Sequence, residues 1–288
     1  MSGQVGLVVH PRRDIESALA ATRAWGSRRG VAIGQIRIPG QTRTIAEPVD
    51  VAACDFVIAL GGDGTALAAL HAAAPASRPV LGIACGSIGA LTSVDSQHLD
   101  SALELVVAGD WLPQALPGLD VNAGATSIAV AINDVAVVRD GTGQVITEIR
   151  VDGEVYARTA GDGVVVATPL GSSAYTMAAG GPILLPAVNA IVLTPLARHG
   201  GVSPPLVVGA ESRIELLVES GYGGSRFEVD GQELPVEALE TTVTLRRDYA
   251  TMIRLAGQEP LLAALRRRGL VVDSPRILAR AERAAHPT

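Results

Sequence analysis

Hydrophobic and polar positions follow two different patterns along the chain, and the change falls near residue 118. Before it, continuous apolar runs alternate with stretches in which apolar residues recur every three or four positions. The runs predict buried strands, and the stretches predict amphipathic helices. Strands are predicted over residues 5–10, 31–38, 55–60 and 79–84, and helices over 13–30, 64–73 and 95–109. This alternation is typical of a mainly parallel sheet with helices on both faces.

Beyond residue 118 the apolar segments are short, β-rich and bounded by glycine. They predict strands over residues 126–139, 144–159, 163–168, 213–220, 225–233 and 241–248. The pairs Asp152–Gly153 and Asp230–Gly231 are typical of two-residue hairpin turns. Helical spacing returns over residues 260–284.

We therefore predict an α/β domain followed by an all-β domain. The first, Rossmann-like, covers residues 1–118, and the second, an antiparallel β-sandwich, covers residues 119–254. The segment 255–288 is predicted to contain a helix that returns to the first domain. Ligands of parallel sheets bind at the carboxyl ends of the strands, which directs attention to the turns found there.

Composition and charge narrow the function classes. With 48% hydrophobic and 18% charged residues, the chain can bury sizeable cores. The net charge is −6 and no basic patch stands out apart from the arginines at 266–268, which disfavours binding to nucleic acid. No apolar segment approaches the roughly 18 residues of a membrane span. Cys54 and Cys85 lack the spacing of a zinc or redox pair. We expect a cytoplasmic protein that acts on small molecules.

A glycine turn, "GGDGT" at residues 61–65, follows one predicted strand and opens a helix. Backbone N–H groups of such turns bind phosphate, although the spacing matches neither a Walker loop nor a dinucleotide fold. Two interpretations stay open for Asp63. It caps the helix, or it accepts the proton of a hydroxyl that attacks a phosphate held by the turn. In the second case glycine N–H groups, arginine and Mg²⁺ supply the charge neutralisation that phosphoryl transfer needs.

A second segment, residues 160–182, is too long and too rich in small residues for a plain strand connection. Its hydroxyl groups and its one aromatic ring, that of Tyr175, suit a nucleotide. The alternative is a seam of small residues packed at a domain interface.

Several motifs occur in the order found in NAD kinases. They are "LGGDGT" (60–65), "IND" (132–134), "GDG" (161–163), "TPLGSSAY" (168–175), "AGGP" (179–182), "TPLARH" (194–199) and "DGQ" (230–232). The chain resembles that family over nearly its whole length. "GGDGT" alone is shared with lipid kinases and some sugar kinases, whereas the glycine-serine segment ending in "AGGP" is more specific.

The resemblance implies transfer of the γ-phosphoryl group of ATP, with Mg²⁺ or another divalent cation, to the 2′-hydroxyl of the adenosine ribose of NAD, giving NADP. The site is expected in a cleft between the two domains. Asp63 matches the catalytic base. The expected phosphate contacts are Gly61, Gly62, Gly64, Thr65 and His199. The expected acceptor contacts are Asn133, Asp134, Asp162, Ser173, Ala174 and Tyr175. The family also implies a homodimer or homotetramer in which β-domain segments complete a neighbour's site.

The chain departs from the family pattern mainly on the acceptor side. Ala84, Ala90, Leu170 and Ala178 stand where the family has asparagine, an aromatic residue, threonine and serine, and Asp134 stands where it has glutamate. Three interpretations follow: an NAD kinase with a loosened adenine pocket, a kinase of another alcohol such as a nucleoside, sugar or polyol, or a non-catalytic protein that binds NAD or ATP. The sequence also leaves open whether polyphosphate replaces ATP and whether NADH is accepted.

Overall fold

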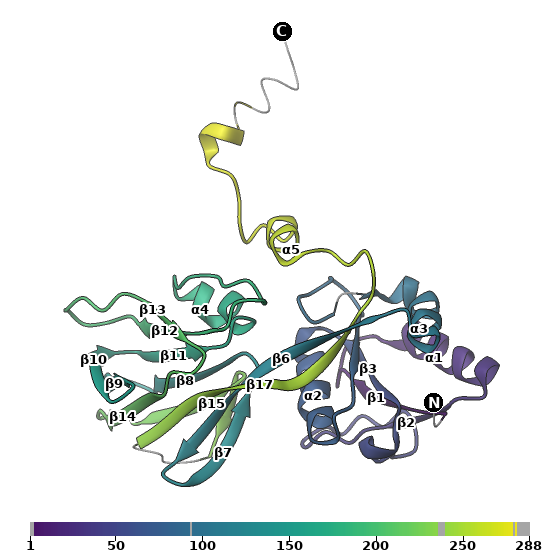
Figure 1. Cartoon of the computed structure of the whole chain (residues 1–288), viewed down its shortest axis with the longest axis horizontal. Coiled ribbons are helices and arrows are strands. Elements are labelled where there is room, and N and C mark those ends of the chain that lie inside the picture. Colours follow the sequence, from purple (N-terminus) through teal and green to yellow (C-terminus); the bar gives the residue numbers. More distant parts are fainter. Residues whose placement is uncertain (1–2, 93, 236–239, 279, 281–288) are drawn as a thin grey trace. The chain divides into compact units, whose positions relative to one another are not determined.

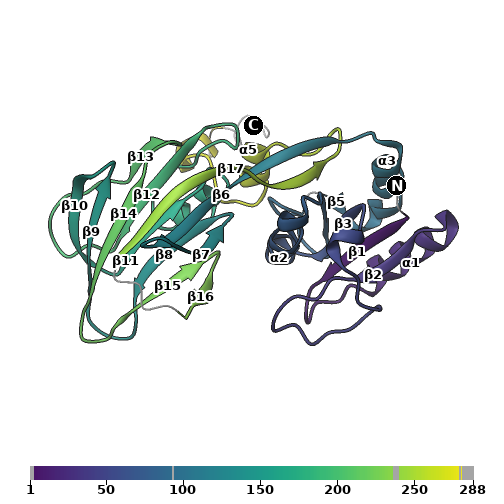
Figure 2. The ribbon, with the colours of Figure 1, turned by 60° about the horizontal axis from the view of Figure 1, so that its bottom comes forward.

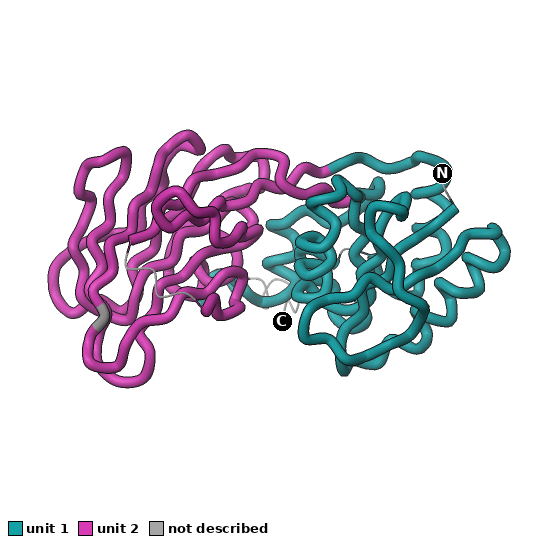
Figure 3. Tube along the Cα trace, turned by 90° about the horizontal axis from the view of Figure 1, so that it is seen from below, with its two compact units in different colours: residues 1–113, 253–288 teal, residues 114–252 magenta. Residues whose placement is uncertain are grey.

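The computed structural model of the 288-residue chain describes residues 3–92, 94–235, 240–278 and 280. The chain divides into two compact units (Figure 3). The first unit consists of residues 1–113 and 253–288, and the second consists of residues 114–252.

The first unit is built on a parallel sheet. Its strands are β1 (Gln4–Val9), β2 (Ala32–Gln35), β3 (Phe56–Gly61), β4 (Val80–Ala84) and β5 (Val94–Asp95). They pair in the order β2-β1-β3-β4-β5, each pair parallel, which confirms the predicted α/β class. The second strand is shorter than predicted because the chain leaves the sheet after Gln35. The side-chain amide of Gln35 instead bonds to the backbone of Arg43 and Ile45, each at 2.7 Å.

Three helices cover this sheet: α1 (Glu16–Arg29), α2 (Asp63–Ala73) and α3 (Leu99–Ala108). Alternate strand residues such as Leu7 and Ile58 pack with Trp25 of α1 and Leu103 of α3 in one core. The helix α2 packs on β3 and β4 and lies on the other side of the strands in Figure 1. The two faces of the sheet are therefore both buried, as continuous apolar strands require.

The second unit contains two sheets with antiparallel pairing, as predicted. One sheet includes β6 (Leu112–Ala123), β7 (Thr126–Ala131), β9 (Val145–Val151), β10 (Glu154–Gly161), β14 (Ile214–Ser220) and β17 (Glu240–Arg254). The other contains β8 (Asp134–Arg139), β11 (Gly163–Ala167), β12 (Ala190–Leu196), β13 (Leu206–Gly209), β15 (Ser225–Val229) and β16 (Gln232–Leu234). Its strand order is β13-β12-β11-β8-β15-β16, and Figure 2 shows β15 and β16 side by side at one edge. Apolar side chains of both sheets, among them Val137 and Leu216, form one core.

Two predicted turns and one predicted strand of the second unit can be compared directly with the structure. Both predicted hairpin turns are confirmed: Asp152–Gly153 joins β9 to β10, Asp230–Gly231 joins β15 to β16, and all four residues have positive φ. The predicted strand 126–139 is instead split at Ile132–Asn133, and its halves, β7 and β8, belong to different sheets.

The C-terminal segment is less continuous than its helical spacing predicts. The helix α5 covers only Leu261–Arg267 (Figure 1), and Gly269, with φ +71°, follows its end. A further helical turn covers residues 275–278. Of the rest of the predicted stretch, residues 279 and 281–284 lie outside the described residues.

Candidate functional site

The glycine turn joins β3 to α2 at the carboxyl edge of the parallel sheet. Gly61 is the last residue of β3, Gly62 is the N-cap of α2, and Asp63 is its first residue. The backbone N–H groups of Thr65 and Ala66 both donate to the Gly62 carbonyl, at 2.9 and 3.1 Å. The cap is formed without a side-chain hydrogen bond, so the interpretation of Asp63 as a helix cap is wrong.

The Asp63 carboxylate instead holds the loop that follows β4. Its Oδ2 accepts the N–H of Ala90 at 2.9 Å, and its Oδ1 accepts the N–H of Leu91 at 2.9 Å. Thr92 adds two further donors to Oδ1, its N–H and its hydroxyl, both at 3.1 Å. We call this arrangement the Asp63 clamp. A Cβ atom on Gly89 would lie 2.0 Å from Oδ1, so the loop approaches this closely only with glycine at that position.

A cavity of about 380 Å³ lies beside the clamp within the first unit. Its polar lining comes from the glycine turn, from the end of β1 and from the loop after β2, and includes His10, Arg13, Gln41, Asp63 and Thr65. Gly62 and Gly64 also line it, whereas Gly61 is buried and does not. Asp63 is half-buried. The turn therefore lines one cavity with Asp63, whose carboxylate is fixed by the clamp, and with the start of a helix, an arrangement suited to phosphate and to an alcohol.

In the second unit another aspartate holds another loop. The Asp230 carboxylate accepts the backbone N–H groups of Ile132, Asn133 and Asp134 at 2.9, 2.6 and 3.1 Å. We call this arrangement the Asp230 clamp. It lies where the predicted single strand is split, because these three N–H groups bond to a side chain instead of a neighbouring strand. Asn133 and Asp134 are thus held in place through the hydrogen bonds that their backbone N–H groups donate to Asp230.

The segment 168–175 packs against the same turn. Thr168 donates through its hydroxyl to the Ile132 carbonyl at 2.7 Å and through its N–H to the Asn133 carbonyl at 2.9 Å. A Cβ atom on Gly171 would lie 1.9 Å from the Asn133 carbonyl oxygen, which explains the glycine there. This packing brings Ser173, Ala174 and Tyr175 next to the turn, with the Ser173 hydroxyl bonded to the Leu170 carbonyl at 3.0 Å.

Asp134 has the most perturbed carboxyl group of this cluster. It is only 5% exposed, and burial, helped by the charge of Asp230, raises its pKa to about 7. A hydrogen bond from the Tyr175 backbone N–H acts in the opposite direction. The carboxyl group is therefore partly protonated near neutral pH and can both donate and accept a hydrogen bond.

Asp162 and His199 do not belong to this cluster. In β11, Ala167 pairs with Asp134, whereas Gly163, next to Asp162, pairs with Val138 at the other end of the strand. There Asp162 forms an ion pair with Arg139 at 2.6 Å. The exposed His199 donates its backbone N–H to the Ala160 carbonyl at 2.8 Å, and its Nδ1 lies 2.9 Å from Gln144 Oε1. The predicted acceptor residues thus form two groups within the second unit.

Comparison with known proteins identifies the family. Residues 11–111 match the model of the ATP-NAD kinase N-terminal domain, and residues 132–249 match the model of the ATP-NAD kinase C-terminal domain. An NAD kinase from Koribacter versatilis is 36% identical over 205 residues, which are 69% of this chain and 72% of that protein. The chain belongs to the NAD kinase family. The resemblance seen in the sequence motifs is confirmed.

Solved structures show that the fold is that of NAD kinases. A yeast NADH kinase in complex with NADH aligns with a TM-score of 0.78 and 22% identity, covering 94% of this chain and 88% of its own. An NAD kinase from Archaeoglobus fulgidus in complex with ATP aligns with a TM-score of 0.72 and 24% identity, covering 93% of this chain and 96% of its own.

Some residues of this NAD kinase fold escaped sequence reasoning. Gly89 and Thr92, which complete the Asp63 clamp, lie 26 and 29 positions from Asp63. The only local signal is a glycine in a loop of small residues. The structure also places two residues that differ from the family's sequence pattern. Ala84 is the fully buried last residue of β4, and Ala90 contributes its backbone N–H to the Asp63 clamp.

The described residues contain no group of three or more histidine, cysteine, aspartate or glutamate side chains that could hold a metal ion. Among the residues that line the cavity, Asp63 supplies the one carboxylate. The donor set therefore does not fit a resident metal site. No helix in the described part of the chain is long and apolar enough to cross a membrane.

Proposed function

We propose that this protein transfers the γ-phosphoryl group of ATP to the 2′-hydroxyl of the adenosine ribose of NAD, giving NADP and ADP. Membership of the NAD kinase family supports a phosphotransferase with an alcohol acceptor. The observation that carries the assignment of the base is the Asp63 clamp, which fixes a half-buried carboxylate at the wall of a cavity. Oδ1 accepts three hydrogen bonds and Oδ2 only one, so Oδ2 has a free lone pair for a hydroxyl.

In this reaction Asp63 is the one side chain that takes up a proton. The ribose oxygen forms a bond to the γ-phosphorus while the bond from that phosphorus to the bridging β,γ-oxygen breaks and ADP leaves. The hydroxyl proton passes to Asp63 Oδ2. Because phosphoryl transfer depends mainly on positioning and charge, a carboxylate fixed by four donors suits the role.

The donor phosphates bind at the glycine turn through the N–H groups of Gly62 and Gly64, at the start of α2, while Thr65, whose N–H bonds to the Gly62 carbonyl, lines the same cavity. Mg²⁺ arrives as the complex with ATP, since Mg²⁺ is commonly held by substrate phosphates and few protein ligands. The acceptor binds through Asn133, Asp134, Ser173, Ala174 and Tyr175, where a partly protonated Asp134 serves as donor and acceptor to hydroxyl groups or a base.

In this proposal Asp162 and His199 also belong to the site, although they lie near the other end of β11 from the cluster. The separation of Asp162 from the cluster supports a homo-oligomer in which a second copy supplies it. Mixing the inactive variants Asp63→Asn and Asp162→Ala tests this, because exchange of subunits would rebuild sites that hold both intact residues. Activity that stays at the sum of the two separate variants would show that each chain uses its own Asp162.

The decisive experiment is to incubate the protein with MgATP and NAD and to measure NADP by mass. A panel of NADH, nucleosides, sugars and polyols runs in parallel. NADP as the main product is the expected result. Consumption of ATP only with another alcohol, or binding of NAD and ATP without any product, would reject the proposed reaction.

A further inference from the structure

The loop that follows β1 carries an arginine, Arg13, which lies across the carboxyl edge of the sheet. Arg13 Nη1 donates to the Cys85 carbonyl at 3.2 Å. The same nitrogen lies 3.3 Å from where a Cβ of Gly62 would be and 3.2 Å from where a Cβ of Gly86 would be. Because Gly62 follows β3 and Gly86 follows β4, the guanidinium spans the ends of two neighbouring strands at the glycine turn.

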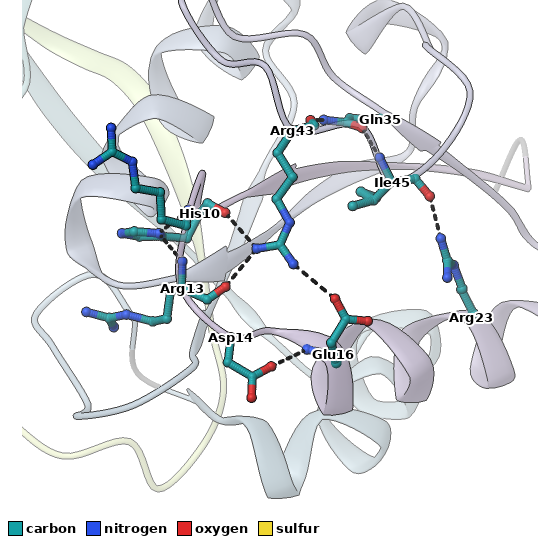
Figure 4. A network of polar contacts seen from close by, with 9 residues as sticks. His10, Arg13, Asp14, Glu16, Arg23, Gln35, Arg43 and Ile45 are labelled. Carbon is teal, nitrogen blue, oxygen red and sulfur yellow. Dashed lines mark hydrogen bonds and ion pairs between the residues drawn. The ribbon is translucent and has the colours of Figure 1, made fainter.

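The backbone that carries Arg13 is held from two sides, as Figure 4 shows. The Nδ1 atom of His10 accepts the N–H groups of Arg12 and Arg13 at 3.1 and 2.8 Å. From the other side, Arg43 Nη1 donates to the carbonyls of His10 and Arg13 at 3.2 and 2.7 Å, and Arg43 Nη2 pairs with Glu16 at 3.0 Å. Burial and the charges of Arg13, Arg43 and Arg12 lower the pKa of His10, which keeps Nδ1 an acceptor.

The charge of Arg13 is available to a ligand. Within the part of the chain that the structure describes, Arg13 forms no ion pair, in contrast to Arg43. Its side chain is exposed and lines the cavity together with Gly62, Asp63, Gly64 and Thr65. A guanidinium has five N–H donors, and one of them is used on Cys85.

Electrostatics shows why such a group is needed here. The chain has no lysine and a net charge of −6, and Asp63 places a negative charge in the wall of the same cavity. A polyphosphate that enters this cavity would be repelled by Asp63 unless a fixed positive charge faces it. Arginine binds phosphate oxygens through two parallel N–H donors, which also orients the ligand.

We propose that Arg13 is the cation that binds the donor triphosphate, from its place against the glycine turn in the lining of the cavity that Asp63 also lines. The inference rests on the proposed function only for the identity of the donor; the site itself is one for polyphosphate. The role of Arg13 is distinct from that of Asp63, which acts on the acceptor hydroxyl.

The test compares Arg13→Gln with Arg12→Gln, a neighbouring exposed arginine that does not line the cavity. Calorimetry measures the Kd for MgATP, for tripolyphosphate and for adenosine. We expect Arg13→Gln to raise the Kd for MgATP and for tripolyphosphate by about 10- to 100-fold, the scale of a lost charge-assisted hydrogen bond. The Kd for adenosine stays within about twofold, and Arg13→Lys lies in between because it keeps the charge without the planar fork.

The outcomes separate this inference from the reaction. Unchanged MgATP affinity in Arg13→Gln, or an equal loss in Arg12→Gln, overturns the role of Arg13 even if the wild-type protein makes NADP. Conversely, phosphate binding that depends on Arg13 in a protein that makes no NADP supports the site and rejects the proposed reaction. A wild-type protein that binds neither MgATP nor tripolyphosphate rejects both. Thermal unfolding of each variant checks that the fold is intact.

Discussion

The two units use the same device for different purposes. In each, one aspartate carboxylate accepts three consecutive backbone N–H groups of a distant loop: Asp63 holds residues 90–92, and Asp230 holds residues 132–134. Both loops lie next to predicted substrate-binding residues. The difference lies in what surrounds each carboxylate. Asp63 lines a cavity with glycines, whereas Asp230 adjoins Asp134, a second carboxyl group that is buried and has a raised pKa.

This difference indicates which clamp can also do chemistry. A carboxylate at a cavity can receive a proton from a ligand, because the ligand reaches it directly. The Asp230 carboxylate acts through two neighbouring residues. It fixes the backbone of Asn133 and Asp134, and its charge contributes to the raised pKa of Asp134. Within the proposed function, we therefore propose that Asp63 takes up the proton and that Asp230 positions the acceptor, and substitutions can test both roles.

The largest effect is expected for Asp63→Asn, compared with Asp230→Asn as its matched control. Each substitution replaces one carboxylate oxygen by an NH₂ group that faces a backbone N–H, so each weakens its clamp by about 2 kcal/mol. Only Asp63→Asn also removes a base, so we expect its kcat to fall by about 10²- to 10⁴-fold. Asp230→Asn should mainly raise the KM for NAD. Steady-state kinetics with both substrates measures this difference.

Equal losses of kcat in the two variants would contradict the distinction between the two clamps. If Asp230→Asn lowers kcat as far as Asp63→Asn does, the Asp63 clamp has no chemical role beyond holding its loop. Both variants should still bind MgATP, which calorimetry checks. The two tryptophans, Trp25 and Trp111, both belong to the first unit, so their fluorescence reports damage there and not in the second unit.

A smaller effect, on stability, is expected from Asp134. Its pKa is raised from 3.8 to about 7 in the folded protein, so between these values the folded state binds more protons than the unfolded state. Stability of the second unit should therefore fall as pH rises from about 4 to about 7, by about 3 kcal/mol. In Asp134→Asn this contribution is absent. Urea unfolding followed by circular dichroism at several pH values measures the difference between the two proteins.

The test is whether the wild-type protein loses or gains stability relative to Asp134→Asn as the pH rises. Contributions from other groups are common to both proteins and cancel. A wild-type protein that gains stability relative to Asp134→Asn over this pH range would contradict the buried, protonated carboxyl group. In the single variant Asp230→Asn, the fall in stability should occur at lower pH than in the wild-type protein, because the charge of Asp230 is one cause of the raised pKa of Asp134.

The sequence was informative where local chemistry decides the structure. The parallel and antiparallel halves, both hairpin turns and the family follow from apolar periodicity, Asp-Gly pairs and glycine motifs. The clamps do not, because each joins residues far apart: Thr92 lies 29 positions from Asp63, and Ile132 lies 98 from Asp230. Whether an aspartate caps its own helix or reaches a distant loop depends on tertiary packing, which a turn of five residues does not encode.

The smallest and most discriminating effect concerns Thr92, the buried side chain of the Asp63 clamp. Thr92→Val keeps the shape and removes the hydroxyl that donates to Asp63 Oδ1 at 3.1 Å and accepts the Gly89 N–H at 3.2 Å. Two backbone N–H groups still hold Oδ1, and the Gly89 N–H still reaches the Thr92 carbonyl at 3.1 Å. We expect a loss of about 1 kcal/mol in the free energy of unfolding, measured by tryptophan fluorescence in urea, with Thr92→Ser unchanged.

The effect of Thr92→Val on kcat separates the two roles of the clamp. With the carboxylate present and still held by three N–H groups, kcat should fall by less than about tenfold, far less than in Asp63→Asn. If Thr92→Val lowers kcat as much as Asp63→Asn while both proteins remain folded, loop geometry limits the rate. Asp63 would then be a positioning residue like Asp230, and the base for the ribose hydroxyl would have to be another group.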